Sequence, residues 1–247
     1  MLNLITAPPS GASTFLNEHP CALLVDAKIQ VAMVQYQVQH FDPEWLKCGY
    51  VDRQIVQHAV IKRQAEYVAG RYCANRALNQ LLAIGQDYVI GKGEHGQPLW
   101  PTGVVGSIAH SHDVAIAVVS HTAKWLGVDC EEVMSTSTAQ QIASMIAKPQ
   151  ELALLSQLDQ PFNYLLSLLF SAKESIYKAI YPSVKKVLDF DMVKLIQLDV
   201  KNEVMTFEFH EELEMILKWN KEISVKYFNV NKRKVTNTIC TLVCEFN

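Results

Sequence analysis

The strongest helical signal in the chain is the stretch Asn163–Ile180, which reads NYLLSLLFSAKESIYKAI. Apolar residues recur in it at steps of three and four positions and therefore share one face of a helix: Leu165, Leu169, Ala172, Ile176 and Ile180. We expect Pro182 to end this helix. Glu174 is about 200° around the helix from Ala172, so it should point away from the core, and Lys178 follows one turn later. Taken alone, these two residues are an ordinary helix-surface ion pair.

Strand and helix patterns alternate along the rest of the chain. Apolar spacing predicts one or two helices in Asp52–Leu82 and further helices at Ser137–Ala147 and Ala153–Leu158. Runs rich in β-branched residues predict strands: two within Ala22–Gln39, then Val114–Val119, Trp125–Glu131, Phe190–Leu198, Val204–Phe209 and Thr238–Cys244. The glycines and prolines of Val89–Pro101 indicate a constrained loop. The fold class is therefore α/β (α+β), and the short polar run Ser120–Lys124 indicates a boundary between two parts.

Composition excludes several classes of protein. Of the 247 residues 49% are hydrophobic and 19% are charged, which is enough apolar material for a substantial core. The net charge is −3 and the basic residues form no long run, so no nucleic-acid partner is expected. No apolar run is long enough to cross a membrane, and the start of the chain does not resemble a secretory signal. Six cysteines without a CxxC pair indicate reduced thiols, and we expect a cytoplasmic protein without a transmembrane segment.

Two acidic residues alternate in the predicted strand Trp125–Glu131. Side chains two positions apart lie on the same face of a strand, so Asp129 and Glu131 would present two carboxylates to one point. Oxygen ligands at that density suit a hard cation such as Mg²⁺. The alternative is a solvated strand edge, which is the more frequent origin of this short pattern on its own.

His110 lies where a loop of small residues is expected to lead into the strand Val114–Val119. The glycine- and proline-rich segment just before it would let the backbone approach a phosphate closely. A lone histidine is more often structural than functional, so both readings stay open on these residues alone.

Four motifs together resemble the 4′-phosphopantetheinyl transferase superfamily, and they follow its order and spacing. They are Gly96-Gln97-Pro98-Leu99-Trp100-Pro101, Gly106-Ser107-Ile108-Ala109-His110, Gly127-Val128-Asp129-Cys130-Glu131 and Phe170-Ser171-Ala172-Lys173-Glu174-Ser175-Ile176-Tyr177-Lys178. The segment Ala65–Arg71 is similar to the first helix of the branch that contains the enterobactin synthetase component D enzymes. The resemblance covers roughly residues 60 to 182, about half of the chain.

The resemblance implies a fold and a set of site residues. The fold is two similar α/β halves with antiparallel sheets, residues 1–122 binding coenzyme A and residues 123–247 binding magnesium, with the active site in a cleft between them. The implied magnesium ligands are Asp129, Glu131 and Glu174, and the implied catalytic residues are Glu174 and Lys178. The implied coenzyme A contacts are Arg63, Arg71, Lys92, His110, Lys173 and Lys178. Ala109 departs from the family, which usually has Ser or Thr there, so a hydroxyl contact to the ligand is either missing or supplied by Ser107 or Ser111.

The activity implied by the resemblance is transfer of the phosphopantetheine arm. A carrier serine would attack the β-phosphorus of coenzyme A, and adenosine 3′,5′-bisphosphate would leave, with Glu174 or a metal-bound water taking the serine proton. The implied partners are apo acyl, aryl or peptidyl carrier domains of a nonribosomal peptide synthetase in siderophore biosynthesis, and the expected state is a monomer. The rival hypotheses are a metal-dependent phosphohydrolase and a non-catalytic module that binds carrier proteins.

Overall fold

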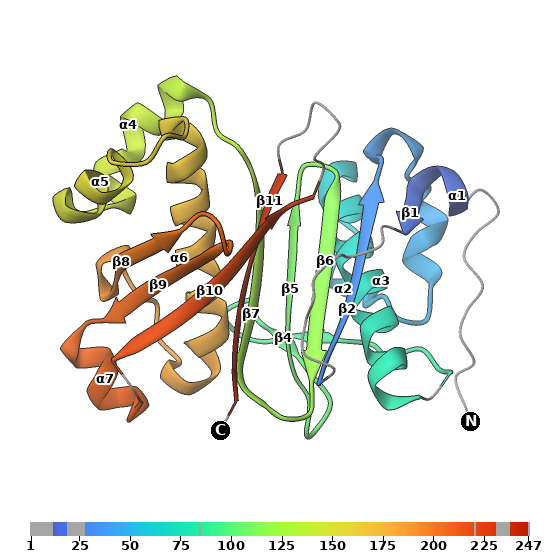
Figure 1. Ribbon diagram of the computed structural model, residues 1–247. Helices are drawn as coiled ribbons and strands as arrows, with labels where there is room; N and C mark the ends of the chain where they lie inside the picture. The colour runs from blue at the N-terminus through green and yellow to red at the C-terminus, as the bar shows by residue number, and fades with distance from the viewer. Residues whose placement is uncertain (1–11, 19–27, 84, 220, 231–237, 247) are drawn as a thin grey trace. The chain divides into compact units, whose positions relative to one another are not determined.

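The structure is a computed structural model that describes residues 12–18, 28–83, 85–219, 221–230 and 238–246 (Figure 1). The chain divides into two compact units, one up to Lys124, which also takes in the last two residues, and one over Trp125–Glu245. Each unit has a sheet and a hydrophobic core, which confirms the mixed α/β class. The predicted cleft between the halves stays a prediction. Among the described residues no helix is long and apolar enough to span a membrane.

The first unit contains a four-stranded antiparallel sheet. Its strands, in spatial order, are β1 (Leu16–Glu18), β2 (Ile29–Tyr36), β6 (Val114–Ser120) and β5 (Val105–Ser111). Helix α3 (Ile61–Leu82) packs on this sheet, against β2, β5 and β6. The core between them is built of small residues, such as Ala69 of α3 and Ala117 of β6, both fully buried. Small side chains let the helix lie close to the sheet.

Shorter elements complete the first unit: α1 (Ala12–Phe15), the 3₁₀ turns η1 (Val38–His40) and η2 (Pro43–Lys47), α2 (Arg53–Val56), and the two-residue strands β3 (Gly91–Lys92) and β4 (Pro98–Leu99). The helical prediction for Asp52–Leu82 is confirmed by α2 and α3. Of the two strands predicted in Ala22–Gln39, the structure describes β2, and the first lies largely outside the described residues.

The expectation of a loop at Gly106–His110 was wrong. These residues belong to β5, which pairs with β6 from Val105↔Ser120 to Ser111↔Val114. The turn between the strands needs a left-handed residue, which is His112, with φ 51°. Glycine, serine and alanine are poor strand formers by propensity, but full pairing with a buried strand outweighs that preference.

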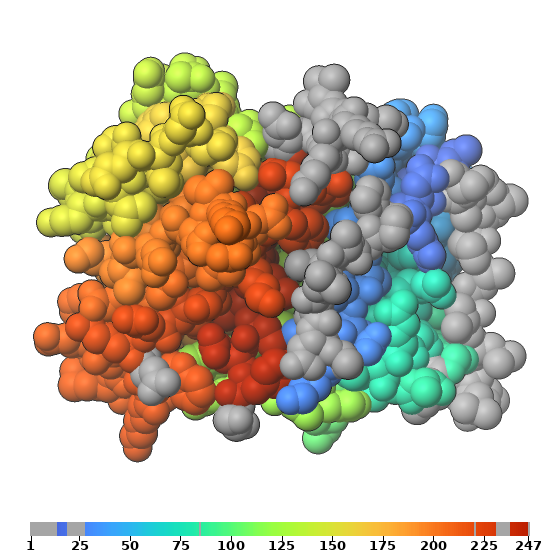
Figure 2. All heavy atoms as spheres, in the orientation of Figure 1, coloured from blue at the N-terminus to red at the C-terminus, as the bar shows by residue number. Residues whose placement is uncertain are grey.

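The second unit contains a five-stranded sheet. Its strands, in spatial order, are β7 (Ala123–Glu132), β11 (Thr238–Phe246), β10 (Glu222–Asn229), β9 (Val204–Phe209) and β8 (Val193–Asp199). The helices are α4 (Thr136–Ile146), α5 (Pro149–Leu155), α6 (Phe162–Val184) and α7 (Glu211–Leu217), and the 3₁₀ turn η3 (Phe190–Met192) precedes β8. Helix α5 packs against β8, and its yellow atoms adjoin orange atoms of the sheet in Figure 2.

Most predicted elements of this unit are confirmed, but α7 was not predicted, α5 lies at Pro149–Leu155 rather than Ala153–Leu158, and Phe190–Met192 form a 3₁₀ turn instead of the start of a strand. Helix α6 continues through Pro182 to Val184, because a proline in the last turn removes only one backbone hydrogen bond near an end that the left-handed Lys185 then closes. Element β10 was missed, although its residues Ile223, Val225 and Tyr227 are buried in alternation with exposed ones. That period of two was the signal that could have found it.

Strand β7 and helix α6 are in direct backbone contact at Gly127. A Cβ atom on Gly127 would lie 2.1 Å from the carbonyl oxygen of Ser175 and 2.7 Å from the amide nitrogen of Ala179, so no other residue fits without displacing the helix. Asp129 and Glu131 follow on the same face of β7, because side chains alternate along a strand. The contact therefore brings both carboxylates to the surface of α6.

Candidate active site

Residues of β7 and α6 form an acidic cluster in the second unit. Asp129 is 4% exposed, and its Oδ1 lies 2.6 Å from Nζ of Lys178. Glu131 and Glu174 are partly buried and both feel the negative charge of Asp129. Ala172 and Ile176 are fully buried on the other side of α6, so Glu174 points away from the core as the periodicity predicted. The structure thus brings together the three predicted acids and Lys178.

Two hydroxyls that sequence reasoning missed hold Asp129 in place. Ser171 Oγ donates a hydrogen bond of 2.8 Å to Asp129 Oδ2, and Thr241 Oγ1 of β11 lies 2.9 Å from Ser171 Oγ. Both hydroxyl residues are fully buried. A buried carboxylate needs such donors to offset the loss of water. The signal in the sequence was a row of serines at four-residue spacing, Ser167, Ser171 and Ser175, all of which are buried in α6.

The electrostatics of the cluster favour a cation. Burial raises the pKa of Glu131 to about 7, and the carboxylates of Asp129 and Glu174 add to the increase while Lys178 opposes it. Burial, and then Asp129, also raise the pKa of Glu174. Burial is the largest influence on the pKa of Lys178 and works to lower it, but the charge and hydrogen bond of Asp129, together with the charges of Cys130 and Glu174, raise the pKa overall. The single ammonium group of Lys178 therefore offsets only part of the negative charge of the three neighbouring carboxylates.

The cluster is not a preformed metal site. In the part of the chain that the structure describes, no group of three or more His, Cys, Asp or Glu side chains is arranged to hold a metal ion. The ammonium of Lys178 contacts the Asp129 oxygen that a metal would use. The donors fit magnesium in their chemistry, because all are carboxylate oxygens whose repulsion a divalent ion would relieve. Magnesium binding would therefore require side chains of the cluster to rearrange, and it stays a prediction.

The raised pKa of Glu131 predicts how stability depends on pH without metal. The folded-state value of about 7 is above the ordinary value of 4.5, so between these values the folded protein binds more protons than the unfolded chain. The free energy of unfolding therefore falls as pH rises through 7. We expect Tm to be a few degrees lower at pH 8 than at pH 6, measured by calorimetry. Glu131→Gln should flatten this dependence, and an unchanged slope in that variant would contradict the assignment.

A basic cavity lies in the first unit, about 170 Å³ in volume and lined by α2, α3, β5 and the β3–β4 region. It brings together all four of the basic residues predicted from this half of the sequence: Arg63, Arg71, Lys92 and His110. One acid, Glu66, lines the same cavity and lies 3.5 Å from Arg63 Nη1. The cavity therefore carries an excess of positive charge suited to an anion.

The position of each basic group in the cavity is fixed by the fold. Arg71 is 8% exposed, donates from Nε to the Ile90 carbonyl at 3.1 Å, and lies with Cζ 4.6 Å from the centre of the Tyr67 ring. Burial lowers the pKa of Arg71, so its charge is incompletely solvated. Arg63 Nη1 donates to His110 Nε2 at 3.1 Å. A phosphate in this cavity would place a negative charge next to the guanidinium of Arg71. That guanidinium can donate two parallel hydrogen bonds to phosphate oxygens.

The hydroxyl missing at Ala109 has no replacement from β5 in this cavity. Ile108 and His110 line the cavity, whereas Ser107, Ala109 and Ser111 alternate with them and lie on the other face of the strand. Ala109 itself is 3% exposed. Of the two alternatives, the residues that line this cavity therefore favour a missing hydroxyl contact over one supplied by Ser107 or Ser111.

Two family models match successive parts of the sequence. Residues 51–120 match the 4′-phosphopantetheinyl transferase N-terminal domain, and residues 126–236 match the 4′-phosphopantetheinyl transferase superfamily. The chain belongs to the 4′-phosphopantetheinyl transferase superfamily. The resemblance read from the motifs is confirmed. The basic residues of the cavity and the residues of the acidic cluster all fall inside the matched ranges of this transferase-family chain.

Several curated proteins are similar to this chain. Enterobactin synthase component D of Salmonella typhi is 42% identical over 138 residues, 56% of this chain and 56% of the relative. Enterobactin synthase component D of Escherichia coli K12 is 42% identical over 124 residues, 50% of this chain and 58% of the relative. 4′-Phosphopantetheinyl transferase Npt of Nocardia iowensis is 33% identical over 150 residues, 60% of this chain and 66% of the relative. The chain thus spans about half the length of the first of these relatives.

Among solved structures, holo-[acyl-carrier-protein] synthase from Neisseria meningitidis matches 50% of this chain and 98% of its own, at 19% identity and a TM-score of 0.35.

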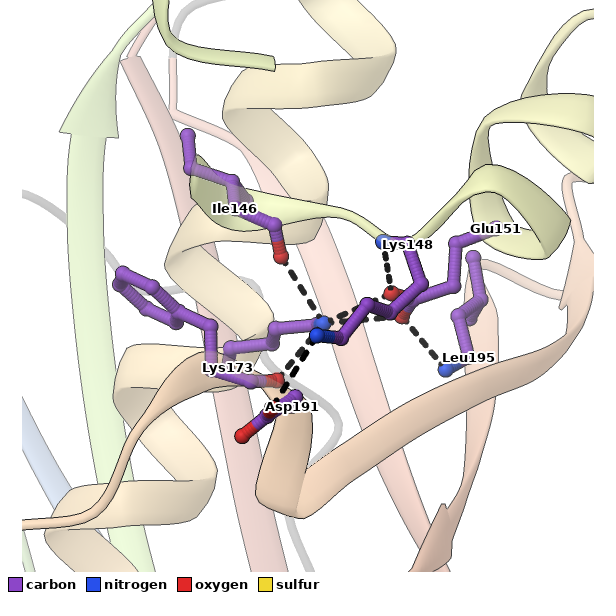
Figure 3. A network of polar contacts seen from close by, with 7 residues as sticks. Ile146, Lys148, Glu151, Lys173, Asp191 and Leu195 are labelled. Atoms are coloured by element: carbon purple, nitrogen blue, oxygen red, sulfur yellow. Dashed lines mark hydrogen bonds and ion pairs between the residues drawn. The ribbon is translucent and has the colours of Figure 1, made fainter. Parts of the chain in front are cut away.

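One predicted ligand contact of this family member differs from the expectation. Lys173 was expected to contact coenzyme A phosphates, but it is 2% exposed and turned into the second unit (Figure 3). Its Nζ donates to the carbonyls of Ile146 at 3.0 Å and Phe190 at 2.9 Å, and to Glu151 at 3.0 Å. An ammonium has three donors, and all three are used within the protein. Helix geometry alone could not show this, because position 173 is next to the exposed side of α6.

Proposed function

We propose that this chain transfers the 4′-phosphopantetheine arm of coenzyme A to a serine of an apo carrier protein. The observation that carries the proposal is the separation of the predicted residues into two groups of opposite charge. Arg63, Arg71, Lys92 and His110 line one cavity of the first unit, whereas Asp129, Glu131, Glu174 and Lys178 interact in the second. A ligand with a phosphate monoester at one end and a metal-binding pyrophosphate suits such a pair of groups. The family match supports the same assignment.

The basic cavity is assigned to the 3′-phosphate of coenzyme A. Arg71 and Arg63 would hold the phosphate oxygens, with Lys92 and His110 beside them. The apolar lining residues Ile55 and Ala59 leave room for a flat ring system next to the charges. Binding here would orient the ligand without taking part in bond breaking.

We expect Arg71→Met to raise the KM for coenzyme A by about 30-fold, which corresponds to loss of about 2 kcal/mol from a charge-assisted hydrogen bond. The KM for dephospho-coenzyme A, which lacks the 3′-phosphate, should change much less, because the lost contact is to that group. The two values are compared by steady-state kinetics with a single apo carrier. Equal increases for both substrates would remove the 3′-phosphate from this cavity.

The acidic cluster is assigned to the pyrophosphate end and to the transfer itself. Magnesium, held by Asp129, Glu131 and Glu174, would neutralise charge on the two phosphates. Glu174 would accept the proton of the carrier serine while the serine oxygen bonds to the β-phosphorus and the P–O bond to adenosine 3′,5′-bisphosphate breaks. In the metal-free cluster, burial and then the Asp129 carboxylate raise the pKa of Glu174. Lys178, whose raised pKa keeps it charged, would move from Asp129 to the departing phosphate.

The carrier is assigned by similarity. Relatives with the name enterobactin synthase component D suggest apo aryl, peptidyl or acyl carrier domains of a nonribosomal peptide synthetase that makes a siderophore. We propose a monomeric enzyme that works in the cytoplasm, where coenzyme A and such synthetases occur together.

The deciding experiment is intact mass spectrometry of several purified apo carriers after incubation with this protein, magnesium and coenzyme A. One carrier should gain the mass of one phosphopantetheine arm, and adenosine 3′,5′-bisphosphate should appear in equal amount. Release of phosphate without a change in the carrier would favour the phosphohydrolase. Binding of a carrier without any reaction would favour the non-catalytic module.

A further inference from the structure

A buried ion pair holds α6 from the side opposite the acidic cluster. Lys173 and Glu151 have side chains that are 1% and 0% exposed, and Lys173 Nζ lies 2.9 Å from Glu151 Oε1 (Figure 3). The two charged side chains are removed from water, which is unfavourable unless every donor and acceptor is satisfied. Burial lowers the pKa of Lys173, and the carboxylate of Glu151 acts against that decrease.

Every polar atom of this pair contacts another element of the second unit. Lys173 Nζ donates to the carbonyl of Ile146 at the end of α4 and to that of Phe190 in η3. Glu151 Oε2 accepts from the Lys148 amide, which begins α5, and Oε1 accepts from the Leu195 amide in β8 at 2.8 Å. One pair therefore connects α6 to α4, α5, η3 and β8.

The Lys173–Glu151 pair lies next to Glu174, which the proposed function places in the reaction. Lys173 precedes Glu174 directly, and α6 is fixed from its other side where Ser171 and Lys178 bond Asp129. The segment of α6 from 171 to 178 is thus fixed at both sides of the helix. A shift or rotation of this segment would move the Glu174 carboxylate relative to Asp129.

We propose that Lys173 and Glu151 form a positioning pair that keeps the Glu174 carboxylate in register with Asp129. This proposal depends on the proposed function, because it gives Glu174 a part in the transfer. Neither residue of the pair touches coenzyme A, and the pair acts through the helix it fastens. The assignment replaces the phosphate contact that the motif resemblance implies for Lys173.

The test compares Lys173→Met, Glu151→Gln and the double variant Lys173→Met/Glu151→Leu. Each single variant leaves a buried polar or charged group without its partner and should lower Tm, whereas the double variant removes both charged groups and should regain part of the Tm. The hydrogen bonds to Ile146, Phe190 and Leu195 are lost in the double variant as well. We therefore expect kcat to stay about 100-fold below wild type in the double variant, with KM for coenzyme A unchanged.

The matched control is Met205→Ala, a fully buried residue of β9 in the same core. It should lower Tm without lowering kcat when the assay is run well below Tm. Recovery of kcat together with Tm in the double variant would show that the pair only stabilises the fold, and would overturn the proposal. A rise of 10-fold or more in KM for coenzyme A in Lys173→Met would overturn it in favour of a phosphate contact.

A second measurement does not depend on transferase activity. Hydrogen exchange of the amides of residues 171–178 should be faster in the double variant than in wild type and unchanged relative to the rest of the core in Met205→Ala. If wild-type protein modifies no carrier, the proposed function fails, but the exchange result still decides whether the pair fixes this segment. Unchanged exchange in the double variant would overturn the positioning role.

Discussion

Replacement of Glu174 by glutamine is expected to abolish transfer, with a loss of kcat of about 10³-fold or more, because the substitution removes both a proton acceptor and a metal ligand. The glutamine has nearly the same volume, and residue 174 is outside the core face of α6. The measurement is the rate of arm transfer followed by mass spectrometry at saturating coenzyme A and magnesium.

The control for Glu174→Gln is a measurement of its stability. Removing one of three mutually repelling carboxylates should leave Tm at neutral pH equal to wild type or slightly higher, because burial and Asp129 disfavour the charged form of Glu174. Coenzyme A should still protect the variant against thermal unfolding through the basic cavity. A Glu174→Gln protein with wild-type turnover would remove Glu174 from the mechanism.

Replacement of Asp129 by alanine should have the second large effect. It removes the carboxylate that pairs with Lys178 and accepts from Ser171, and we expect kcat/KM to fall by about 10³-fold at physiological magnesium. Any residual activity should require much higher magnesium. A magnesium titration of the variant that matches wild type would contradict the metal assignment.

Asp129→Asn is the matched variant, because the amide oxygen can still accept from Ser171 while the negative charge is lost. It should remain better folded than Asp129→Ala and be similarly inactive. The pKa of Glu131 should also move down from about 7, since the Asp129 carboxylate contributes to its increase. The dependence of Tm on pH in the metal-free protein should then become weaker, which provides a readout independent of catalysis.

Most helices and strands, and the faces that carry the acidic residues, could be predicted from local sequence because their signals are local. A period of three to four positions predicted α6, and a spacing of two placed Asp129 and Glu131 on one face of β7. The spacing of four placed Glu174 and Lys178 on one side of α6, but only the resemblance of the motifs joined them to these carboxylates. Such periodicities depend only on the geometry of a single element.

The rest depends on contacts between segments far apart in the sequence. Strand β5 forms because β6 pairs with it along its whole length, which outweighs the weak strand preference of Gly106 and Ser107. Lys173 is turned inward because Glu151, 22 positions earlier, supplies a buried carboxylate. Thr241 reaches Ser171 from a strand 70 positions later. No spacing rule within a single helix or strand contains this information.

The backbone contact at Gly127 fixes how closely β7 and α6 approach each other. Main-chain atoms of β7 and α6, and not the apolar side chains around them, set the gap between strand and helix at this point. Substitutions of apolar residues elsewhere in the second unit should therefore change the distance between β7 and α6 at this point less than a substitution of Gly127. The distance between β7 and α6 at this point is thus set by the absence of a side chain at Gly127.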